Sequence, residues 1–599
     1  MPEKSNRRKY LRIATVLPVE FFIVDNQDKR ITPWLQGFTC NIGRGGICLT
    51  VNDLWWGFWD KIKVKDNRLF LQIEFFLWKE PVYTKARVVW FKEEKSSSFC
   101  RYVLGIEFLE INSKKTALLF GYALSKRVIP YAVGGVIIGL ALSLFSLFWQ
   151  NYAVVRENRR LVGDYVNILE KTALLEELLK QDKVDIENIP KMEEQVMLLQ
   201  RERSEVSYKI IQGMYNWVKN RQDLISGLVL SFEGDNNLEK VSFTYDQALA
   251  VFVFLIEGDD ERAEKILDFY LEKIQKEDIY NAYFSRGNVF EYTIHSGPNA
   301  WIGLAALDYT KRTGNRKYLP IAVKVGDFLL EMMDKEGGVG GGPGVSWYST
   351  EHNLDAFAFF KLLYQVTGED RYEKAATKVK KWLAKYAYTS YGPPVKRGKG
   401  DSTIATDTYT WSITALGPEL LYSLGMNPES ILQFAVEHCE TKTKFIYKTR
   451  EAVLRGFDFA KVKHEPRGGI VSGEWTSQMI LAFEVMADYF KQKDSKKHKE
   501  YLEKANFYFD ELQKMLITSP SRVGREDPCL PYASDSFIDT GHGWKTPKGI
   551  ATGSLASTAY FLIAYHGYNP LKGEFLQVSL KPHNHQSHKD IKGEIENAR

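Results

Sequence analysis

Acidic side chains recur in the C-terminal part of this 599-residue sequence, each near the start of an apolar run rich in Ala and Gly. Hydrolysis of a glycosidic bond needs one carboxylic acid that protonates the leaving oxygen and one carboxylate that activates water or attacks the sugar. Glu351 and Glu474 are the acid and base candidates, because Glu is a poor helix N-cap. Asp246, Asp355 and Asp407 are expected to position the sugar or the water.

Aromatic and imidazole side chains accompany these acids, and flat rings can stack on the CH faces of sugars. The candidate substrate-binding residues are Trp301, Trp347, Tyr348, His352, Trp411 and Trp475. No metal site and no catalytic cofactor are predicted, because the His-x-His and His-x-x-x-His spacings are missing from the sequence of residues 208–570.

A second interpretation of the same acids remains open. Asp and Asn before a helix are often N-caps, and Asp246, Asn353 and Asp407 could have that role alone.

Glu351 and Asp355 are four residues apart, so both are expected on one helix face near its N-terminus, where the helix dipole favours negative charge.

The elements that position these residues repeat along residues 208–570. Apolar segments with helical periodicity begin near Asp246, Asn299, Asn353, Asp407, Gln478 and Ser554. In the second and third repeats an amphipathic segment follows, which is typical of an inner helix packed on all sides and an outer helix with one wet face. Six inner helices predict a closed ring, with residues 208–224 as the outer partner of the last one.

This layout resembles the six-hairpin glycosidases, whose all-α fold is an (α/α)6 toroid. The resemblance covers about 360 residues, which we assign as residues 208–570. It implies a sugar cleft at the end where the inner helices begin, which is where the acids and aromatic residues listed above are found.

The N-terminal part has a different pattern. Residues 6–115 alternate apolar and polar side chains in short runs separated by Gly, Pro, Asn and Asp, which predicts a small antiparallel β-barrel. Arg8 and Arg12 are four residues apart in RKYLR, with Arg7 as an extra cation, and NIGRGG follows at residues 41–46. Guanidinium groups can grip phosphates, and a Gly-rich turn lets the backbone approach a ligand.

Together these two motifs resemble a PilZ domain, a family that binds cyclic di-GMP. The resemblance implies that Arg7, Arg8, Arg12, Asn41, Gly43 and Gly46 form the ligand site. Gly43 stands where the family pattern has Ser, so one hydroxyl contact is missing. Because cyclic di-GMP is a cytoplasmic messenger, the resemblance also implies a cytoplasmic N-terminus.

Between the two parts, residues 128–149 contain no charge, which predicts one transmembrane helix. We therefore expect a single-pass inner-membrane protein with a periplasmic C-terminal domain. Residues 150–207 predict a coiled-coil or helical stalk, which leaves a homodimer open. Residues 571–599 have the composition of a disordered tail.

Composition excludes some classes of function. The formal net charge is only +5, which argues against nucleic acid as a partner. Five cysteines without a Cys-x-x-Cys pair indicate neither a disulfide scaffold nor a zinc module. Cys439 and Cys529 could pair with each other or stay reduced, and spacing does not decide between the two.

The sequence thus predicts a membrane-anchored, cyclic di-GMP-responsive glycoside hydrolase that acts on an extracytoplasmic polysaccharide, such as an exopolysaccharide. One alternative is a non-catalytic glycan-binding receptor or scaffold for exopolysaccharide synthesis or export. Another is a polysaccharide lyase on the same fold, in which Tyr348 and His352 would serve as base and stabiliser.

Overall fold

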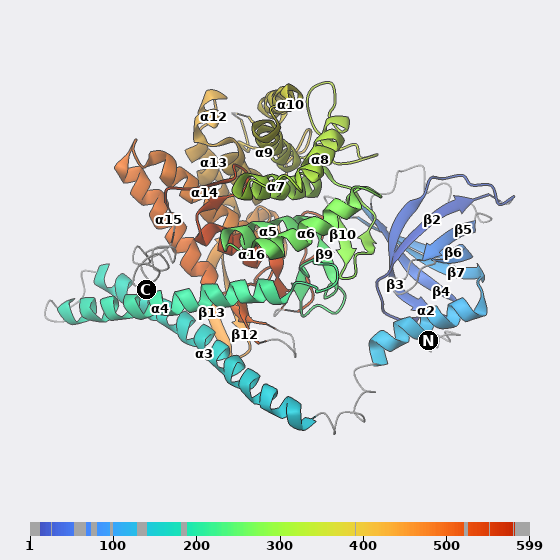
Figure 1. The fold of residues 1–599 in the computed structure, drawn as a ribbon, viewed down its shortest axis with the longest axis horizontal. Helices are drawn as coiled ribbons and strands as arrows, with labels where there is room; N and C mark the ends of the chain where they lie inside the picture. Colours follow the sequence, from blue (N-terminus) through green and yellow to red (C-terminus); the bar gives the residue numbers. More distant parts are fainter. Residues whose placement is uncertain are drawn as a thin grey trace, which may run out of the picture. The chain divides into compact units, whose positions relative to one another are not determined.

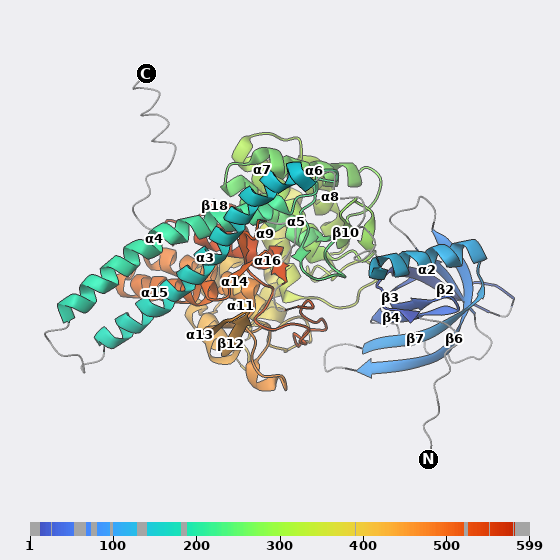
Figure 2. The same cartoon turned by 90° about the horizontal axis from the view of Figure 1, so that it is seen from below.

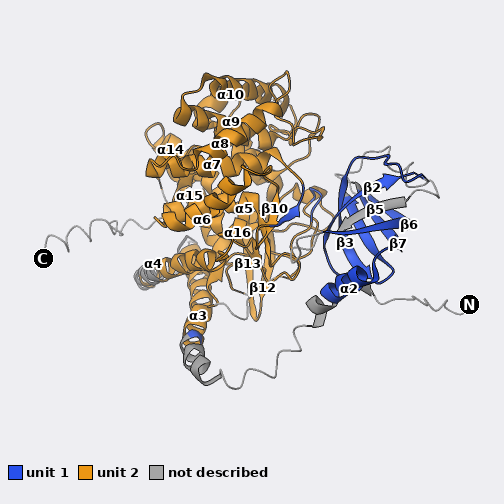
Figure 3. Cartoon of the chain, turned by 45° about the vertical axis from the view of Figure 1, so that its right-hand side comes forward, with its two compact units in different colours: residues 1–151, 288–292, 541–544 blue, residues 152–287, 293–540, 545–599 orange. Residues whose placement is uncertain are grey.

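The computed structural model describes residues 12–25, 27–52, 68–73, 81–95, 100–128, 141–180, 189–389, 391–519, 525–549, 552–578 and 580. The chain forms two compact units (Figure 3). Unit 1 contains residues 1–151, 288–292 and 541–544, and unit 2 contains residues 152–287, 293–540 and 545–599.

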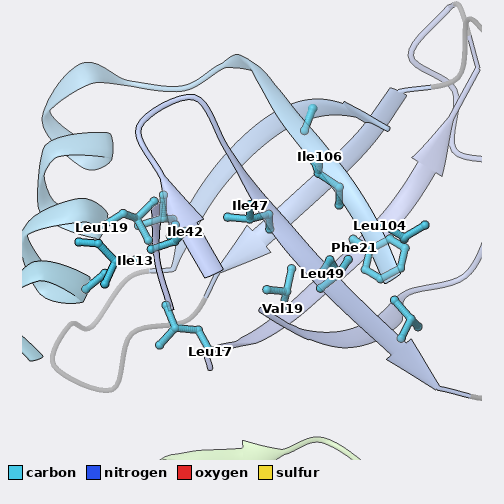
Figure 4. Packing of buried hydrophobic residues seen from close by; sticks show 14 of the residues in the cluster. Ile13, Leu17, Val19, Phe21, Ile42, Ile47, Leu49, Leu104, Ile106 and Leu119 are labelled. Atoms are coloured by element: carbon cyan, nitrogen blue, oxygen red, sulfur yellow. The ribbon is translucent and has the colours of Figure 1, made fainter. Parts of the chain in front are cut away.

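Unit 1 is built on one antiparallel sheet of seven strands in the order β1-β3-β2-β5-β6-β7-β4, with a further pairing between β3 and β4. The strands are β1 (Arg12–Ile13), β2 (Pro18–Val24), β3 (Leu35–Gly43), β4 (Gly46–Asn52), β5 (Arg68–Ile73), β6 (Val82–Lys95) and β7 (Cys100–Glu110). Alternate side chains point inward, so Val19, Phe21, Leu49 and Leu104 meet in one core (Figure 4).

Helix α2 (Ser113–Val128) completes this core with Leu119 and Ala123. The predicted simple barrel is therefore corrected to a curved seven-stranded sheet, with β1 added at its edge and a helix against its core. The helix could not be predicted from the alternating pattern, because it begins where that pattern ends.

The predicted membrane topology is wrong. No helix among the described residues combines the length and the apolar character that a bilayer span requires. Residues 129–140 of the expected span at 128–149 lie outside the described residues, and the remainder belongs to the ends of α2 and α3 (Ala141–Lys180). The single-pass inner-membrane localisation is corrected accordingly.

Unit 2 is dominated by pairs of helices (Figure 1). The pairs are α5 (Thr244–Ile256) with α6 (Asp260–Lys273), α7 (Ser296–Thr313) with α8 (Leu319–Glu331), α9 (Thr350–Thr367) with α10 (Asp370–Trp382), α11 (Thr406–Trp411) with α13 (Pro428–Cys439), α14 (Gly473–Phe490) with α15 (Ser495–Gln513), and α16 (Leu555–Tyr565) with α4 (Ile189–Asn220). A π-helical turn, η4 (Ser412–Leu416), continues α11, and α12 (Pro418–Ser423) follows it.

The first helices of these pairs form a closed ring. Helix α5 contacts α7, α7 contacts α9, α9 contacts α11, α11 contacts α14 and α14 contacts α16. The ring closes because α16 packs on α5. These helices are buried almost all round, whereas α10 buries one face only. This confirms the predicted all-α, toroid-like fold, including α4 as the outer partner of the last inner helix.

Strands and helical turns lie between the helices of unit 2. They are β8 (Phe232–Glu233), β9 (Val241–Phe243), β10 (Ala282–Phe284), β12 (Glu440–Tyr447), β13 (Arg450–Phe457), β14 (Ile517–Thr518), β15 (Pro528–Cys529), β16 (Gly553–Ser554), β17 (Tyr568–Asn569), β18 (Glu574–Phe575), η3 (Leu383–Ala387) and η5 (Val462–His464), together with β11 (Val289–Glu291) of unit 1. Cys439 and Cys529 are both buried and not in a disulfide.

The predicted stalk at 150–207 is not a separate coiled coil. Helix α3 contacts the outside of the toroid: Arg159 forms an ion pair with Glu526, between β14 and β15, and Tyr165 Oη donates to Gln513 Oε1 of the outer helix α15 at 2.5 Å. Figure 2 shows α3 and α4 running along unit 2. The apolar stripe that suggested an oligomer is therefore used, in part, to cover the ring of the same chain.

Candidate functional site

The beginnings of the inner helices are set by their caps. Ser349 Oγ accepts from the backbone N–H of His352, and Ser472 Oγ accepts from that of Trp475. Asp246 and Asp407 are not caps, because they lie inside the first turns of α5 and α11, after Phe243 and Ala405. Their carboxyl groups are thus left for another role.

Other polar residues near the beginnings of the inner helices form hydrogen bonds to the backbone of neighbouring loops. Asn353 accepts from the backbone N–H of Val339 at 2.8 Å and donates to the carbonyl of Val339 at 3.0 Å. Gln247 holds Val229 in the same way. These amides have a structural role, which separates them from the carboxyl groups beside them.

The structure brings the five predicted carboxyl groups together. Asp246, Asp355, Asp407 and Glu474 are buried, and Glu351 is half-buried. The charges of Asp407, Asp355 and Glu474 all act on Glu351 and help raise its pKa. These groups come from α5, α9, α11 and α14, so one cluster spans the ring of inner helices.

Glu474 is set up to hold a proton at neutral pH. Burial raises its pKa to about 8, although hydrogen bonds from Tyr245 and Gln478 oppose the rise. Tyr245 Oη donates to Glu474 Oε1 at 2.7 Å, and Gln478 Nε2 donates to the same oxygen at 3.0 Å. Burial likewise raises the pKa of Asp246 to about 7.

Asp407 is the easiest of the group to ionise. Burial raises its pKa to about 6, while Arg397 and a hydrogen bond with Glu351 hold it down. The pKa of Glu351 lies well above its usual value because of burial and then the charge of Asp407. The two residues therefore act as a pair that keeps one proton, with Glu351 as donor and Asp407 as acceptor.

A hydrogen bond from Trp301 orients the carboxyl group of Asp355. Trp301 Nε1 donates to Asp355 Oδ1 at 2.9 Å, and the Trp301 ring meets Tyr245 edge-on, with centroids 5.1 Å apart. Burial raises the pKa of Asp355 well above its usual value. One oxygen each of Asp246, Asp355 and Asp407 is buried without a hydrogen-bond partner among the described residues.

The predicted stacking residues divide into two groups. Trp301, Trp411 and Trp475 are 1%, 3% and 6% exposed, so their rings are covered by the protein. Trp347 is 44% exposed and its ring lies 5.4 Å from that of His352, measured between centroids. Gly341, in the glycine run 337–344, leaves room for the Trp347 ring, since a Cβ there would lie 2.4 Å from it.

His352 and its neighbour His295 are held neutral. Burial lowers the pKa of His295 to about 4 and that of His352 to about 3. Tyr348 lies elsewhere, against Trp382 and Lys399. No group of His, Cys, Asp and Glu that could hold a metal ion occurs among the described residues.

Two site residues were missed from the sequence. Arg397 lies in an irregular segment between α10 and α11, where no periodicity marks it. Tyr560 is buried in the middle of α16, and the charges of Glu474 and Asp355 act on it. Its helix was predicted, but its hydroxyl could not be distinguished there from a core side chain.

In unit 1 the backbone brings the two ligand motifs side by side. Arg12 on β1 pairs with Gly43 on β3, and Gly43 pairs with Gly46 across the turn to β4. A Cβ on Gly46 would lie 2.0 Å from the Ile106 carbonyl oxygen, so this position has no room for a side chain. Asn41 Oδ1 is buried without a hydrogen-bond partner among the described residues. Arg7 and Arg8 lie outside them.

The family model described as PilZ domain matches residues 6–124, which extends the predicted domain through most of α2. No curated protein sequence matches the chain.

Solved structures are similar to about 60% of the chain. A sugar epimerase from a ruminal bacterium is 10% identical, with a TM-score of 0.43, covering 60% of this chain and 97% of its own. Cellobiose 2-epimerase from Bacillus thermoamylovorans is 12% identical (TM-score 0.41, 61% and 98%). An α-1,6-mannanase variant of Salegentibacter sp. with bound α-1,6-mannotriose is 15% identical (0.39, 61% and 98%).

The toroid-like fold rests on the closed ring of helix contacts described above, and the N-terminal assignment rests on the family match together with the paired motifs of β1, β3 and β4. Residues 6–124 of this chain are a PilZ domain, followed by an (α/α)6 toroid-like domain.

Proposed function

We propose that unit 2 is a glycoside hydrolase acting on a polysaccharide, with Glu474 as general acid and the Glu351–Asp407 pair as general base. The observation that carries the proposal is the cluster of carboxyl groups from four inner helices, in which Tyr245 and Gln478 both donate to Glu474. Burial raises the pKa of Glu474 to about 8 and that of Asp407 to about 6, which supports different roles for the two. At neutral pH one group then holds the proton that the leaving oxygen needs, and the other can take a proton from water.

The remaining residues are assigned positioning roles. Tyr245 orients Glu474, and Trp301 orients Asp355. One oxygen each of Asp246 and Asp355 has no hydrogen-bond partner among the described residues and could bond to a sugar hydroxyl or to water. The exposed ring of Trp347 offers a stacking surface beside His352. The buried rings of Trp301, Trp411 and Trp475 support the site from behind.

The test is reducing-end release by the full chain from β-glucans and amino-sugar polymers, with Glu474→Gln beside the wild type. We expect kcat to fall by ~10²–10⁴-fold, the usual contribution of a general acid. Glu484→Gln is the matched control, because it makes the same change on the same helix and its pKa responds to burial alone. Unchanged turnover in Glu474→Gln would contradict the assignment.

The pH dependence follows from the same two groups. The acid must be protonated, so kcat/KM should fall as the pH rises through about 8. The base must be ionised, so kcat/KM should fall as the pH drops through about 6. A profile measured from pH 4 to 10 should therefore be bell-shaped with its maximum near neutrality. A profile with only one limb would remove one of the two assignments.

A lyase is the second candidate, favoured by one observation. His352 is neutral at neutral pH, and its Nδ1 has no partner among the described residues, so it could form a hydrogen bond that stabilises the reacting sugar, although its lowered pKa makes it a weak base. A lyase leaves an unsaturated sugar end that absorbs ultraviolet light, whereas a hydrolase does not. Polymer binding without either product would favour the glycan-binding scaffold.

For unit 1 we propose that cyclic di-GMP binds at Arg12, Asn41 and the Gly43–Gly46 turn, together with Arg7 and Arg8, and controls unit 2. The proposal is supported by the pairing of Arg12 with Gly43 and by the Asn41 oxygen, which has no hydrogen-bond partner within the described part of the chain. A homodimer is not needed for it.

The test is calorimetric titration of the full chain with cyclic di-GMP. Arg12→Ala should abolish binding and any effect of the nucleotide on polymer hydrolysis. Arg30→Ala is the control, because Arg30 stacks on Phe22 and Trp34 away from the motifs. Equal affinity in wild type and Arg12→Ala would contradict the proposed site.

A further inference from the structure

Two cysteines of unit 1 lie next to each other on neighbouring strands. Cys48 is on β4, opposite Asn41 of β3. The register between β3 and β4 shifts between Thr39 and Asn41, so Cys40 is the extra residue of a β-bulge there. The two thiols are hydrogen-bonded to each other, and neither is in a disulfide.

The environment of this pair differs from that of a thiol in a protein core. Cys40 Sγ also shares a hydrogen bond with Thr50 Oγ1 at 2.6 Å. The charge of Arg101, from β7, lowers the pKa of Cys40, and the weaker influence of Glu94, from β6, raises it. The hydrogen bond with Cys48 is the largest influence, and together these contacts lower the pKa of Cys40 to about 6 despite its burial. Cys40 is half-buried, while Cys48 is 5% exposed.

The other two thiols with described side chains behave in the opposite way. Burial raises the pKa of Cys439 to about 12 and that of Cys529 well above its usual value. Both are fully buried. Three elements of the sheet, β3, β4 and β7, thus converge to activate one thiol and to place a second within reach of it.

From this geometry we infer that Cys40 and Cys48 form a redox-active dithiol that reacts with low-molecular-weight disulfides, with Cys40 as the attacking thiol and Cys48 as the resolving thiol. The order follows from access, because only Cys40 can be reached from solution.

The reaction balances in two exchange steps. The Cys40 thiolate attacks one sulfur of RSSR, which forms the mixed disulfide Cys40–S–S–R and releases RS⁻. Cys48 then loses its proton, and its thiolate attacks the Cys40 sulfur and displaces the second RS⁻. Two electrons pass from the two cysteines to the small disulfide, which is reduced to two thiols, and the protein gains a Cys40–Cys48 bond.

The site is one residue from Asn41 of the proposed nucleotide site, but the inference does not depend on nucleotide binding or on polymer hydrolysis. Its test uses neither. The full chain carrying Cys100→Ser, which removes the cysteine whose side chain is not described, is treated with oxidised glutathione without denaturant. The products are then identified by peptide mass spectrometry.

We expect a peptide linked through Cys40 and Cys48, with Cys439 and Cys529 unmodified. Cys48→Ser should stop at glutathione on Cys40, and Cys40→Ser should give neither product. Modification of Cys48 before Cys40, or a Cys48→Ser variant that accumulates no mixed disulfide, would overturn the inference.

A second measurement keeps the test decisive if a cysteine variant fails to fold. The rate of Cys40 modification in the otherwise intact chain should be nearly constant between pH 7 and 9, because the thiol is already ionised. In the urea-unfolded chain the rate should rise with pH up to ~8.5, the ordinary thiol pKa. The same rising profile in the folded chain would overturn the inference.

Discussion

Glu484 lies in the middle of the inner helix α14, and its side chain is fully buried. Neither of its carboxyl oxygens has a hydrogen-bond partner among the described residues. Burial holds its pKa well above the usual value. The folded state therefore binds its proton more tightly than the unfolded state does. The stability that this proton supports is complete at low pH and is lost as the pH rises above the unfolded value of ~4.3.

Glu484→Gln should remove this dependence. We expect the variant to unfold at a higher temperature than wild type at pH 8 and at nearly the same temperature at about pH 3, where the wild-type carboxyl is almost fully protonated in the unfolded state as well as in the folded state. Each ~1 kcal/mol recovered corresponds to roughly 2–4 °C. Thermal unfolding at both pH values checks this, and an equal difference at the two would show that packing, not charge, is responsible.

At the residue scale, the repeat spacing and the resemblance to six-hairpin glycosidases together pointed to the carboxyl cluster, since Asp246, Asp407 and Glu474 all fall where an apolar run begins. Sequence could not show which side of each helix a ring occupies. Trp301 and Trp347 look equivalent in the sequence, yet one is 1% exposed and the other 44%. The pairing of Glu351 with Asp407 depends on contacts between different helices, which spacing along one helix does not contain.

At the scale of elements, β4 and β7 approach so closely that Gly46 has no room for a side chain. Gly46→Ala should separate the strands and cost about 1–3 kcal/mol, towards the upper end because the obstacle is backbone. Gly121→Ala on α2 is the control, because a Cβ there meets nothing within 4 Å and Ala is ~1 kcal/mol better than Gly in a helix.

Hydrogen exchange of the full chain measures these stability changes in unit 1 without interference from unit 2, because it reports the protection of each strand separately. Amides of β4 and β7 should lose protection in Gly46→Ala and keep or gain it in Gly121→Ala. Unchanged protection in Gly46→Ala would mean that the sheet can accommodate a methyl group there.

Helices and strands were predicted correctly where one hydrophobic period extends over enough consecutive residues. The inner helices of the ring and the strands of the sheet follow from periods of 3.6 and 2. What α3 packs against could not be predicted, because an apolar stripe such as Tyr165 and Ile168 fits a partner helix, a second chain or the same domain equally well. The structure assigns it to the same domain.

At the scale of the whole molecule, this docking changes where the helical domain begins. Val162, Val166 and Leu169 on α3 are 2%, 2% and 3% exposed. A fragment that starts at residue 208 lacks these side chains. The burial of each such aliphatic side chain contributes ~1.5–3 kcal/mol to the free energy of unfolding. The fragment also cuts α4 (Ile189–Asn220), the outer partner of α16, within its length.

A fragment of residues 152–599 should therefore unfold at a distinctly higher temperature than one of residues 208–599. The shorter fragment should also self-associate, because the surface of α15 that receives Tyr165 becomes exposed. Thermal unfolding and light scattering of the two fragments check this. If both are monomers with the same unfolding temperature, α3 rests on the ring without stabilising it, and the domain begins at residue 208.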